Sequence, residues 1–353
     1  MANQRIRLGI IGAGSVTTDK GRHIDSFREL NDPDAEIVAL ADVIPGFAEK
    51  TARRFSIAHG FDDYRRLLEM KEINAVAINT PTPTHKQIAI DALKAGKHVY
   101  VEKPITRNAA ELEELVNVAK GSDKIFIGGS NGLLQRQMKT FKDMIDEGLL
   151  GEVYLFSVER GSGRGDSYGM AVKPKQGDGI STHSGSHNVE WALYFLGDPR
   201  AVSVSAKGYF KNRNLSVPWQ ERDEDDDCCV ATVFFDNGAT FLYKAMRAAP
   251  VRDHYEMKIY GDKMSVEYDV NKCYKQKRDD CITLYRHSET IGMEVSSLLY
   301  KCERGHAAMY RYFFSCIREN RLEVNRCERG LETMRILDAM VKSIDLGGKQ
   351  VFL

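Results

Sequence analysis

The stretch that decides the fold is Gly9-Ile10-Ile11-Gly12-Ala13-Gly14-Ser15-Val16-Thr17, in which a short apolar run ends in a glycine-rich turn. The run begins at Ile6 and has the length of a buried strand, and the residues after Gly14 are expected to begin a helix. Gly12 permits a tight turn, and Gly14 lets the backbone approach a pyrophosphate, as in dinucleotide-binding turns. The third glycine position of such turns holds Thr17, so this motif is weak on its own.

As far as about residue 128, apolar runs alternate with amphipathic segments. Strands that alternate with helices predict right-handed βαβ units, and hence a parallel sheet covered on both faces. The predicted strands after the first are 36–42, 75–79, 98–101 and 125–127, and the predicted helices are 16–30, 46–55, 84–95 and 109–119. We therefore predict a doubly wound, Rossmann-type domain over residues 1–129.

Beyond residue 150 the apolar residues recur with a period of two, which is typical of antiparallel strands. Asp236-Asn237-Gly238 predicts a hairpin turn, because Asn-Gly tolerates positive φ angles. The predicted strands are 153–159, 201–206, 229–235, 239–244 and 255–260, with helices at about 186–196, 303–319 and 328–346. The fold class is therefore α/β, with a C-terminal α+β domain over residues 130–353 that contains a large, mostly antiparallel open sheet.

Composition excludes several classes of function. The 353 residues contain 50 lysines and arginines against 50 aspartates and glutamates, so no net field attracts nucleic acid or an anionic membrane. The acidic run Glu221 to Asp227 is expected to be a solvated loop. No apolar run approaches the ~20 residues that cross a bilayer, and the first residues enter a strand with no room for a signal peptide. The seven cysteines include no Cys-x-x-Cys pair, so neither a disulfide framework nor a zinc knuckle is indicated and a cytoplasmic protein is expected.

Asp42 stands at the tip of the second predicted strand. A carboxylate at this position accepts hydrogen bonds from the ribose hydroxyls of adenosine and repels a 2′-phosphate. More residues separate Asp42 from the glycine turn in the sequence than is usual, and the Asn31-Asp32-Pro33-Asp34-Ala35 loop can contain the extra residues. Because no arginine follows Asp42 directly, we expect NAD rather than NADP as the cofactor.

A second informative stretch is Gly96-Lys97-His98-Val99-Tyr100-Val101-Glu102-Lys103-Pro104, which follows Thr80-Pro81-Thr82-Pro83-Thr84-His85. A predicted strand here delivers an acid, a lysine and a proline in succession. Lysine can exchange a proton with an alcohol or a carbonyl, and proline can fix the bend that aims it, including as a cis bond. The alternative is a surface Glu-Lys pair before a helix, but the flanking motifs favour the catalytic interpretation.

Two histidines lie four residues apart in Gly179-Ile180-Ser181-Thr182-His183-Ser184-Gly185-Ser186-His187-Asn188-Val189-Glu190. Residues i and i+4 share a face of a helix, so His183 and His187 can converge. Three interpretations stay open: a metal site, which needs a third ligand and which Gly185 disfavours by interrupting a regular helix; packing histidines; or a catalytic pair, because neutral imidazole can accept a hydroxyl proton.

Together these segments resemble the glucose–fructose oxidoreductase / inositol dehydrogenase / rhizopine-catabolism (Gfo/Idh/MocA) family. The likeness is strongest in Ala95 to Pro104, and Gly148-Leu149-Leu150-Gly151-Glu152-Val153 and other landmarks extend it over nearly the whole chain. Members are typically NAD(P)-dependent oxidoreductases of sugars and cyclitols. The resemblance implies that Lys103 is catalytic and that Glu102 helps to hold the cofactor. The other cofactor contacts that it implies are Gly12, Gly14, Ser15, Val16, Asp42, Thr80, Pro81, Thr82, His85, Lys103 and Asn131.

The chain departs from this family at one position. An Asp-x-Gly-x-His element of the family maps onto His183-Ser184-Gly185-Ser186-His187, so His187 keeps the place of the usual general acid/base while His183 replaces the aspartate. Lys103 thereby loses a negatively charged neighbour that would stabilise its protonated form. The protonation states in the site are therefore expected to differ from those usual in the family, and the substrate group that reacts is not identified. The Thr182-His183 pair is loosely similar to NAD-dependent glycosidases of the same superfamily, which oxidise a hydroxyl, eliminate the aglycone and return the hydride.

The leading hypothesis is an NAD-dependent oxidoreductase that acts on a secondary hydroxyl of a sugar, glycoside or cyclitol. His187 would take the proton, Lys103 would hydrogen-bond the same oxygen, and His183 would orient the substrate or relay the proton. The alternatives are a redox-cycling glycosidase and a non-catalytic sugar- or NAD-sensing regulator. We expect a homo-dimer or homo-tetramer, no metal, and no nucleic-acid or membrane partner. The predicted substrate contacts besides Lys103, His183 and His187 are Arg164, Tyr168 and Lys173, in a polar loop.

Overall fold

The apolar run at the start of the chain forms β1 (Ile6–Ile11), an inner strand of a parallel sheet. The structure is a computed structural model and describes residues 5–162, 179–210, 226–247, 249, 251–274, 276–303, 305–322 and 324–353. Packing divides the chain into a first unit of residues 1–134 and 304–331 and a second unit of residues 135–303 and 332–353. The predicted domains, 1–129 and 130–353, place residues 304–331 in the second domain, whereas packing assigns these residues to the first unit.

The strands of the first unit form a six-stranded parallel sheet in the order β3-β2-β1-β4-β5-β6 among the residues described. The strand order changes direction between β1 and β4, which is where nucleotide sites lie in sheets of this type. This sheet confirms the predicted doubly wound domain. The further strands are β2 (Ala35–Ala41), β3 (His59–Phe61), β4 (Ala75–Ile78), β5 (His98–Val101) and β6 (Phe126–Gly128).

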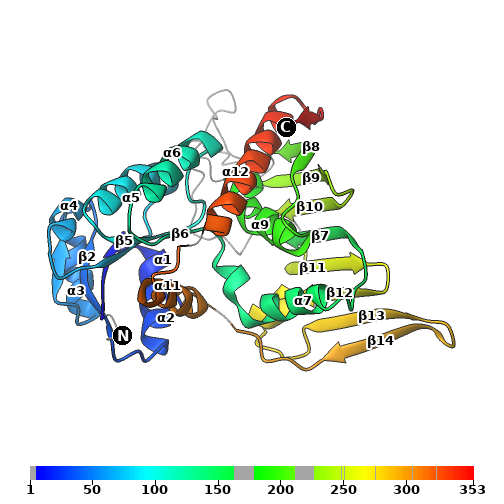
Figure 1. The fold of residues 1–353 in the computed structure, drawn as a ribbon, viewed down its shortest axis with the longest axis horizontal. Helices are drawn as coiled ribbons and strands as arrows, with labels where there is room; N and C mark the ends of the chain where they lie inside the picture. The colour runs from blue at the N-terminus through cyan, green and yellow to red at the C-terminus, as the bar shows by residue number, and fades with distance from the viewer. Residues whose placement is uncertain are drawn as a thin grey trace. The chain divides into compact units, whose positions relative to one another are not determined.

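Helices cover both faces of this sheet (Figure 1). Ile6, Leu8 and Ile10 of β1 belong to a buried cluster with side chains of α2, α3 and α11, so these helices share one face. Helices α5 and α6 pack together over the other face. The helices are α1 (Ser15–Thr18), α2 (His23–Glu29), α3 (Phe47–Arg54), α4 (Tyr64–Leu68), α5 (His85–Lys94), α6 (Ala109–Lys120) and α11 (Ala307–Glu319), with single 3₁₀ turns at η1 (Thr82–Thr84) and η2 (Asn131–Leu134).

The single helix predicted over 16–30 is wrong, because the chain forms α1 and α2 with a turn between them. Gly21 lies in this turn with a φ of 75°, a conformation that favours glycine. Its N–H donates to the Asp25 carboxylate at 2.9 Å, which fixes the turn against the start of α2. The spacing of apolar residues along the sequence does not indicate this turn, because the turn residues are polar and few.

The second unit contains a mixed sheet in the order β14-β13-β12-β11-β7-β10-β9-β8-β15. Within the described residues only β7 and β10 pair in parallel, so the predicted mostly antiparallel sheet is confirmed. The predicted hairpin joins β9 and β10, where Gly238 has a φ of 85°. The strands are β7 (Val153–Gly161), β8 (Ala201–Tyr209), β9 (Cys228–Phe235), β10 (Thr240–Met246), β11 (His254–Gly261), β12 (Met264–Asp269), β13 (Ile282–Ser288), β14 (Gly292–Leu298) and β15 (Val351–Phe352).

Helices of the second unit lie on one face of its sheet, where α8 and α9 contact β7, β9 and β10. The helices are α7 (Arg136–Asp146), α8 (Ile180–His183), α9 (Gly185–Phe195), α10 (Val270–Tyr274) and α12 (Val324–Asp345), and α12 continues from the first unit. None of the helices in the described ranges combines the length and the apolar character that crossing a bilayer requires.

Candidate active site

The first unit aligns several loops at one edge of its sheet. The N–H of Gly12 donates to Ala41 O at 2.7 Å, that of Asn79 to Ile11 O at 2.8 Å, and that of Glu102 to Ile78 O at 3.0 Å. These bonds continue the parallel ladders past the ends of β1, β4 and β5. The glycine turn, Asp42 and Glu102-Lys103 therefore emerge at the carboxyl edge of the same sheet, where ligands bind in doubly wound folds.

The two glycines of the turn serve different purposes. Gly12 has a φ of 96°, and a Cβ there would lie 2.7 Å from Asn79 O, so a side chain is excluded. Gly14 has no atom within 4 Å of the position of a Cβ, which leaves open space above the turn. Thr17, at the third glycine position, is buried and donates from Oγ1 to Gly12 O at 2.6 Å. Thr17 thus stabilises the glycine turn, although it replaces the third glycine of the dinucleotide-binding motif.

Asp42 contacts the glycine turn directly. One carboxylate oxygen accepts from the N–H of Ala13 at 2.9 Å and the other from the N–H of Ile44 at 3.0 Å. The side chain is half-buried at the end of β2, so lone pairs of both oxygens remain for a further donor. Val43 and Ile44 follow with 85% and 57% of their surfaces exposed, an apolar pair beside the acid that the sequence analysis missed.

Glu102 is buried inside the first unit with 6% of its surface exposed. Its carboxylate accepts hydrogen bonds from His23 Nε2 at 3.1 Å and Tyr100 OH at 2.8 Å, and His306 Nε2 lies at 3.2 Å. Burial raises the pKa of Glu102, but the hydrogen bonds from His23 and His306 outweigh burial and hold it well below its usual range. Glu102 is therefore an anion at neutral pH. Its second oxygen accepts from the N–H of Lys103 at 3.0 Å.

His23 completes this cluster in its neutral form. Its Nδ1 accepts from Tyr310 OH at 2.8 Å while Nε2–H donates to Glu102, which uses both ring nitrogens without a positive charge. Burial, together with the nearby His306, lowers the pKa of His23 to about 4. His23, His306 and Tyr310 were not predicted from the sequence. The four-residue spacing of His306 and Tyr310 on a predicted helix was the available signal.

Acid is expected to destabilise the first unit through His23. The unfolded side chain titrates near 6.5 and the folded one near 4, so stability is complete above pH 6.5 and is lost as the pH falls toward 4. The loss from His23 is about 3 kcal/mol. His98, whose pKa burial also lowers to about 4, adds to it. Urea unfolding between pH 7 and 4 measures this loss.

A matched pair of variants isolates the contribution of His23. His23→Gln keeps a donor toward Glu102 but cannot titrate, so its stability should fall less steeply with acid. His59→Gln changes an exposed histidine of the same unit and should follow the unmodified protein. Equal slopes for His23→Gln and the unmodified protein would contradict the assignment.

His85 joins the loops after β4 and β5. Its Nε2 lies 2.7 Å from Thr80 O, and its Nδ1 lies 2.9 Å from Pro104 O. Burial lowers the pKa of His85, and the carbonyls of Thr80 and Pro104 oppose this shift. The peptide bond between Lys103 and Pro104 is cis, and Lys103 is half-buried.

Of the other predicted cofactor contacts, Ser15, Val16 and Pro81 are exposed, Thr82 is buried in η1, and Asn131 is half-buried at the start of η2.

His183 and His187 lie in the second unit. His183 ends α8 and His187 falls in the first turn of α9, and both are half-buried. The expected interruption of a regular helix is present, because α8 ends at His183 and α9 begins at Gly185, although Ser184 between them has helical angles. Gly185 also permits close packing, because a Cβ there would lie 3.1 Å from Leu337 of α12. The ring of His187 lies 6.4 Å from that of Trp191.

Buried polar contacts fix the helical segment that bears these histidines. Asp226 is buried, and its carboxylate accepts from Ser181 N at 3.0 Å and Ser181 Oγ at 2.6 Å, at the start of α8. The solvated run predicted over 221–227 is therefore wrong at Asp226, whereas residues 221–225 lie outside the described part. Tyr255 donates to Asn188 Oδ1 at 2.8 Å and stacks on Trp191 at 6.0 Å. The second unit thus holds His187 on a rigid element.

The predicted site residues therefore fall into two groups. The glycine turn, Asp42, Thr80, His85, Glu102 and Lys103 share one edge of the first sheet, and His183 and His187 lie together in the second unit. Arg164, Tyr168 and Lys173 lie outside the described residues. Within the described chain, two groups of three potential metal ligands occur, and neither contains His183 or His187.

Family models match both parts of the chain. Residues 6–130 match "Oxidoreductase family, NAD-binding Rossmann fold", and residues 142–351 match "Oxidoreductase family, C-terminal alpha/beta domain". The chain belongs to the Gfo/Idh/MocA oxidoreductase family. The resemblance inferred from Ala95 to Pro104 is thereby confirmed, and the first unit is an NAD-binding Rossmann domain of this family.

Relatives within the Gfo/Idh/MocA family act on cyclitols and sugars. The scyllo-inositol 2-dehydrogenase (NAD(+)) of Bacillus subtilis (strain 168) is 28% identical over 262 residues, which cover 74% of this chain and 73% of the relative. The D-glucoside 3-dehydrogenase of Escherichia coli (strain K12) is 24% identical over 358 residues, covering 98% and 97%. A solved levoglucosan dehydrogenase in complex with NADH and L-sorbose has the same fold, with a TM-score of 0.85, 21% identity and 99% of each chain covered.

Proposed function

We propose that this protein is an NAD-dependent dehydrogenase that oxidises a secondary hydroxyl of a sugar, glycoside or cyclitol. The observation that carries the proposal is the shared sheet edge at which the Gly12 turn, Asp42 and the Glu102-Lys103 pair emerge. The retention of His187 at the family's acid/base position supports the same conclusion. The inositol and glucoside dehydrogenases among its relatives support the substrate class.

The residues of the first unit fit a dinucleotide. The open space above Gly14 admits a pyrophosphate to the backbone, which a Cβ would obstruct. Asp42 offers carboxylate oxygens to ribose hydroxyls, and the exposed Val43 and Ile44 offer an apolar surface to an adenine ring. Asp42 also repels a 2′-phosphate, which favours NAD over NADP.

The proposed chemistry depends on four side chains. Bound NAD supplies the hydride acceptor. His187 takes the hydroxyl proton, since neutral imidazole is a suitable acceptor near pH 7. Lys103 donates a hydrogen bond to the same oxygen and stabilises its developing negative charge. Glu102 keeps the Lys103 backbone in place through the bond to its N–H. His183 orients the hydroxyl or relays the proton.

One experiment tests this function directly. The purified protein is incubated with NAD and a panel of free sugars, glycosides and inositols, and nicotinamide reduction and product release are followed in parallel. We expect one reduced cofactor per oxidised product. Release of aglycone without net nicotinamide reduction would instead indicate a redox-cycling glycosidase. The feature that favours this alternative is His183, which occupies the position of the family's usual aspartate. Binding of sugar and NAD without turnover would indicate a sensing regulator.

The cofactor preference depends on Asp42. Asp42→Asn keeps the shape and one acceptor for the Ala13 N–H but removes the charge. We expect it to weaken NAD binding by roughly 1.5–3 kcal/mol and to narrow the difference between NAD and NADP. Fluorescence titrations with both cofactors measure this change. Tighter binding of NADP than NAD by the unmodified protein would refute the preference.

We propose that a second copy of the chain covers the open face of the second sheet. Val230 and Phe234 on β9 and Leu242 on adjacent β10 expose 44%, 43% and 40% of their surfaces on the face opposite the buried Phe241. Clustered exposed apolar side chains mark association surfaces. Leu242→Glu is expected to reduce the mass measured by light scattering, whereas Leu346→Glu, at an exposed leucine after α12, should not. A monomeric unmodified protein would contradict this proposal.

A further inference from the structure

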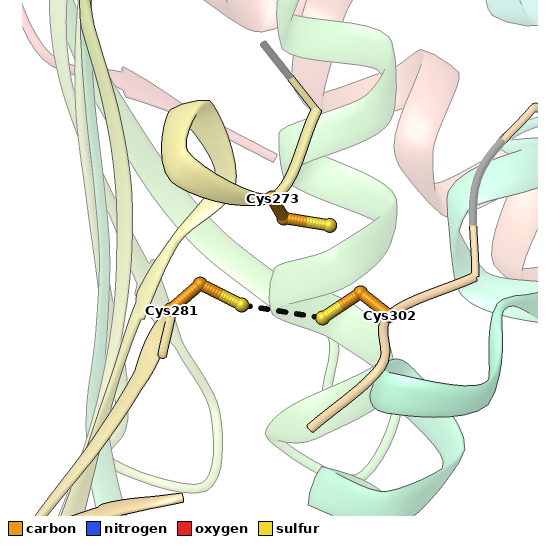
Figure 2. Close-up of side chains that lie close together, drawn as sticks. All are labelled: Cys273, Cys281 and Cys302. Carbon is orange, nitrogen blue, oxygen red and sulfur yellow. Dashed lines mark hydrogen bonds between the residues drawn. The ribbon is translucent and has the colours of Figure 1, made fainter. Parts of the chain in front are cut away.

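Three cysteines that are distant in sequence converge in the second unit. Cys273 belongs to α10, Cys281 immediately precedes β13, and Cys302 follows β14. Their sulfur atoms all lie within 4.8 Å of one another, and Cys281 Sγ lies 3.3 Å from Cys302 Sγ. In Figure 2 the three side chains point toward one common space from three separate segments. The spacing Cys-x7-Cys-x20-Cys matches no zinc motif, so the sequence alone does not predict the cluster.

The surroundings of this cluster favour a bound cation over a disulfide. The three residues are 0%, 2% and 7% exposed. A disulfide would join only two of the three converging sulfur atoms, whereas a bound cation uses all three. Three buried thiols around one point instead match the ligand set that soft metal ions prefer.

We propose that Cys273, Cys281 and Cys302 bind one Zn²⁺ ion as thiolates. A Zn–S bond of about 2.3 Å in tetrahedral geometry places sulfur atoms about 3.8 Å apart. The Cys281–Cys302 separation of 3.3 Å and the upper limit of 4.8 Å for all three pairs bracket this value, so small side-chain adjustments suffice. Each thiol releases its proton to solvent as its sulfur bonds to zinc, and a water molecule or external ligand completes the fourth position.

The bound ion acts as a structural clamp. The N–H of Asp269, at the end of β12, donates to Cys281 O at 2.8 Å, and the N–H of Tyr300 donates to Asp279 O at 2.8 Å, so backbone bonds already join these segments. Zinc would link α10 to both ends of the β13–β14 hairpin. This hairpin forms the edge of the sheet and exposes Ile291, Met293 and Val295, so it has few packing contacts of its own. The site is independent of NAD binding and of the proposed activity.

Cobalt binding tests the site. Reduced, metal-free full-length protein is titrated with Co²⁺ alone, and the thiolate-to-cobalt charge-transfer absorption is recorded. We expect one Co²⁺ per chain, displacement by Zn²⁺, and a higher Tm after zinc addition. Cys273→Ser, Cys281→Ser and Cys302→Ser should each weaken metal binding by at least about 10²-fold, because each removes one of three protein ligands. Affinity should also fall with acid as protons compete for sulfur.

Cys228→Ser is the matched control, because Cys228 lies on β9 of the same unit and outside the cluster. This variant should bind Co²⁺ and gain Tm with zinc as the unmodified protein does. Because a cluster variant can fail to fold, the titration of the unmodified protein stands as a separate test. Absence of the charge-transfer band, equal binding by the cluster variants, or mass-spectrometric detection of a Cys281–Cys302 disulfide in protein purified without reductant would each overturn the proposal.

Discussion

Replacing Lys103 by alanine is expected to lower kcat by about 10²-fold or more while NAD affinity changes little. The lysine side chain stabilises negative charge on the substrate oxygen as the proton leaves, and this interaction strengthens in the transition state. The main chain does not depend on the side chain, because Glu102 holds the Lys103 N–H at 3.0 Å and His85 contacts Pro104 O at 2.9 Å. Steady-state kinetics and a separate NAD titration measure the two effects.

Two further lysine variants distinguish a chemical role from a general effect of charge. Lys103→Arg keeps a positive charge but presents a larger, planar guanidinium in place of the compact ammonium, so it should recover only part of the lost rate. Lys94→Ala removes an exposed lysine in the last turn of α5 and should leave kcat unchanged. Near-normal turnover in Lys103→Ala would return Glu102-Lys103-Pro104 to the interpretation as a surface pair.

The parts of the site that are formed by residues close together in the sequence were predictable from the sequence. A strand followed by a glycine turn, and an acid at the end of the next strand, are local patterns, so Gly12 and Asp42 were placed before their contact through Ala13 was known. The strand and turn patterns also predicted both sheets. Strands β3, β12, β13, β14 and β15 were not predicted. Of these, β13 and β14 lie at a sheet edge, where most side chains are partly or fully exposed, so burial does not impose an alternation of apolar residues.

The partners of Glu102 could not be predicted, because they are distant in sequence. His23 lies 79 positions from Glu102, and Tyr310 lies 287 positions from His23. The amphipathic pattern of α11 predicted a helix with one buried face, but the pattern does not specify the sheet against which that face packs. Met309 and Phe313 of α11 pack in the core of the first unit, which brings His306 to the buried carboxylate. Only tertiary structure identifies such a cluster.

Replacing His187 by alanine is expected to lower kcat/KM by about 10²–10⁴-fold, because the substrate proton then has no acceptor. The acid limb of the pH profile of kcat/KM, which reports ionisation of the acceptor, should disappear with the activity. The fold of the second unit should survive, since Asp226, Tyr255 and Leu337 anchor the helical segment without the His187 side chain. Circular dichroism and NAD titration provide the structural controls, and chelator treatment should leave the unmodified enzyme active.

His183→Asp is the informative companion, because it restores the residue that the family usually has at this position. The new carboxylate would stabilise the charged forms of Lys103 and His187 if these groups share the substrate, so we expect a changed preference among sugars and cyclitols with NAD affinity retained. A packing role for His183 predicts the opposite pattern, with lower stability and the same preference. Loss of activity in chelator, with recovery on adding zinc, would show that the histidines hold a metal only if Cys281→Ser, which lacks a ligand of the proposed cysteine site, responds in the same way. That result would exclude His187 as the free proton acceptor.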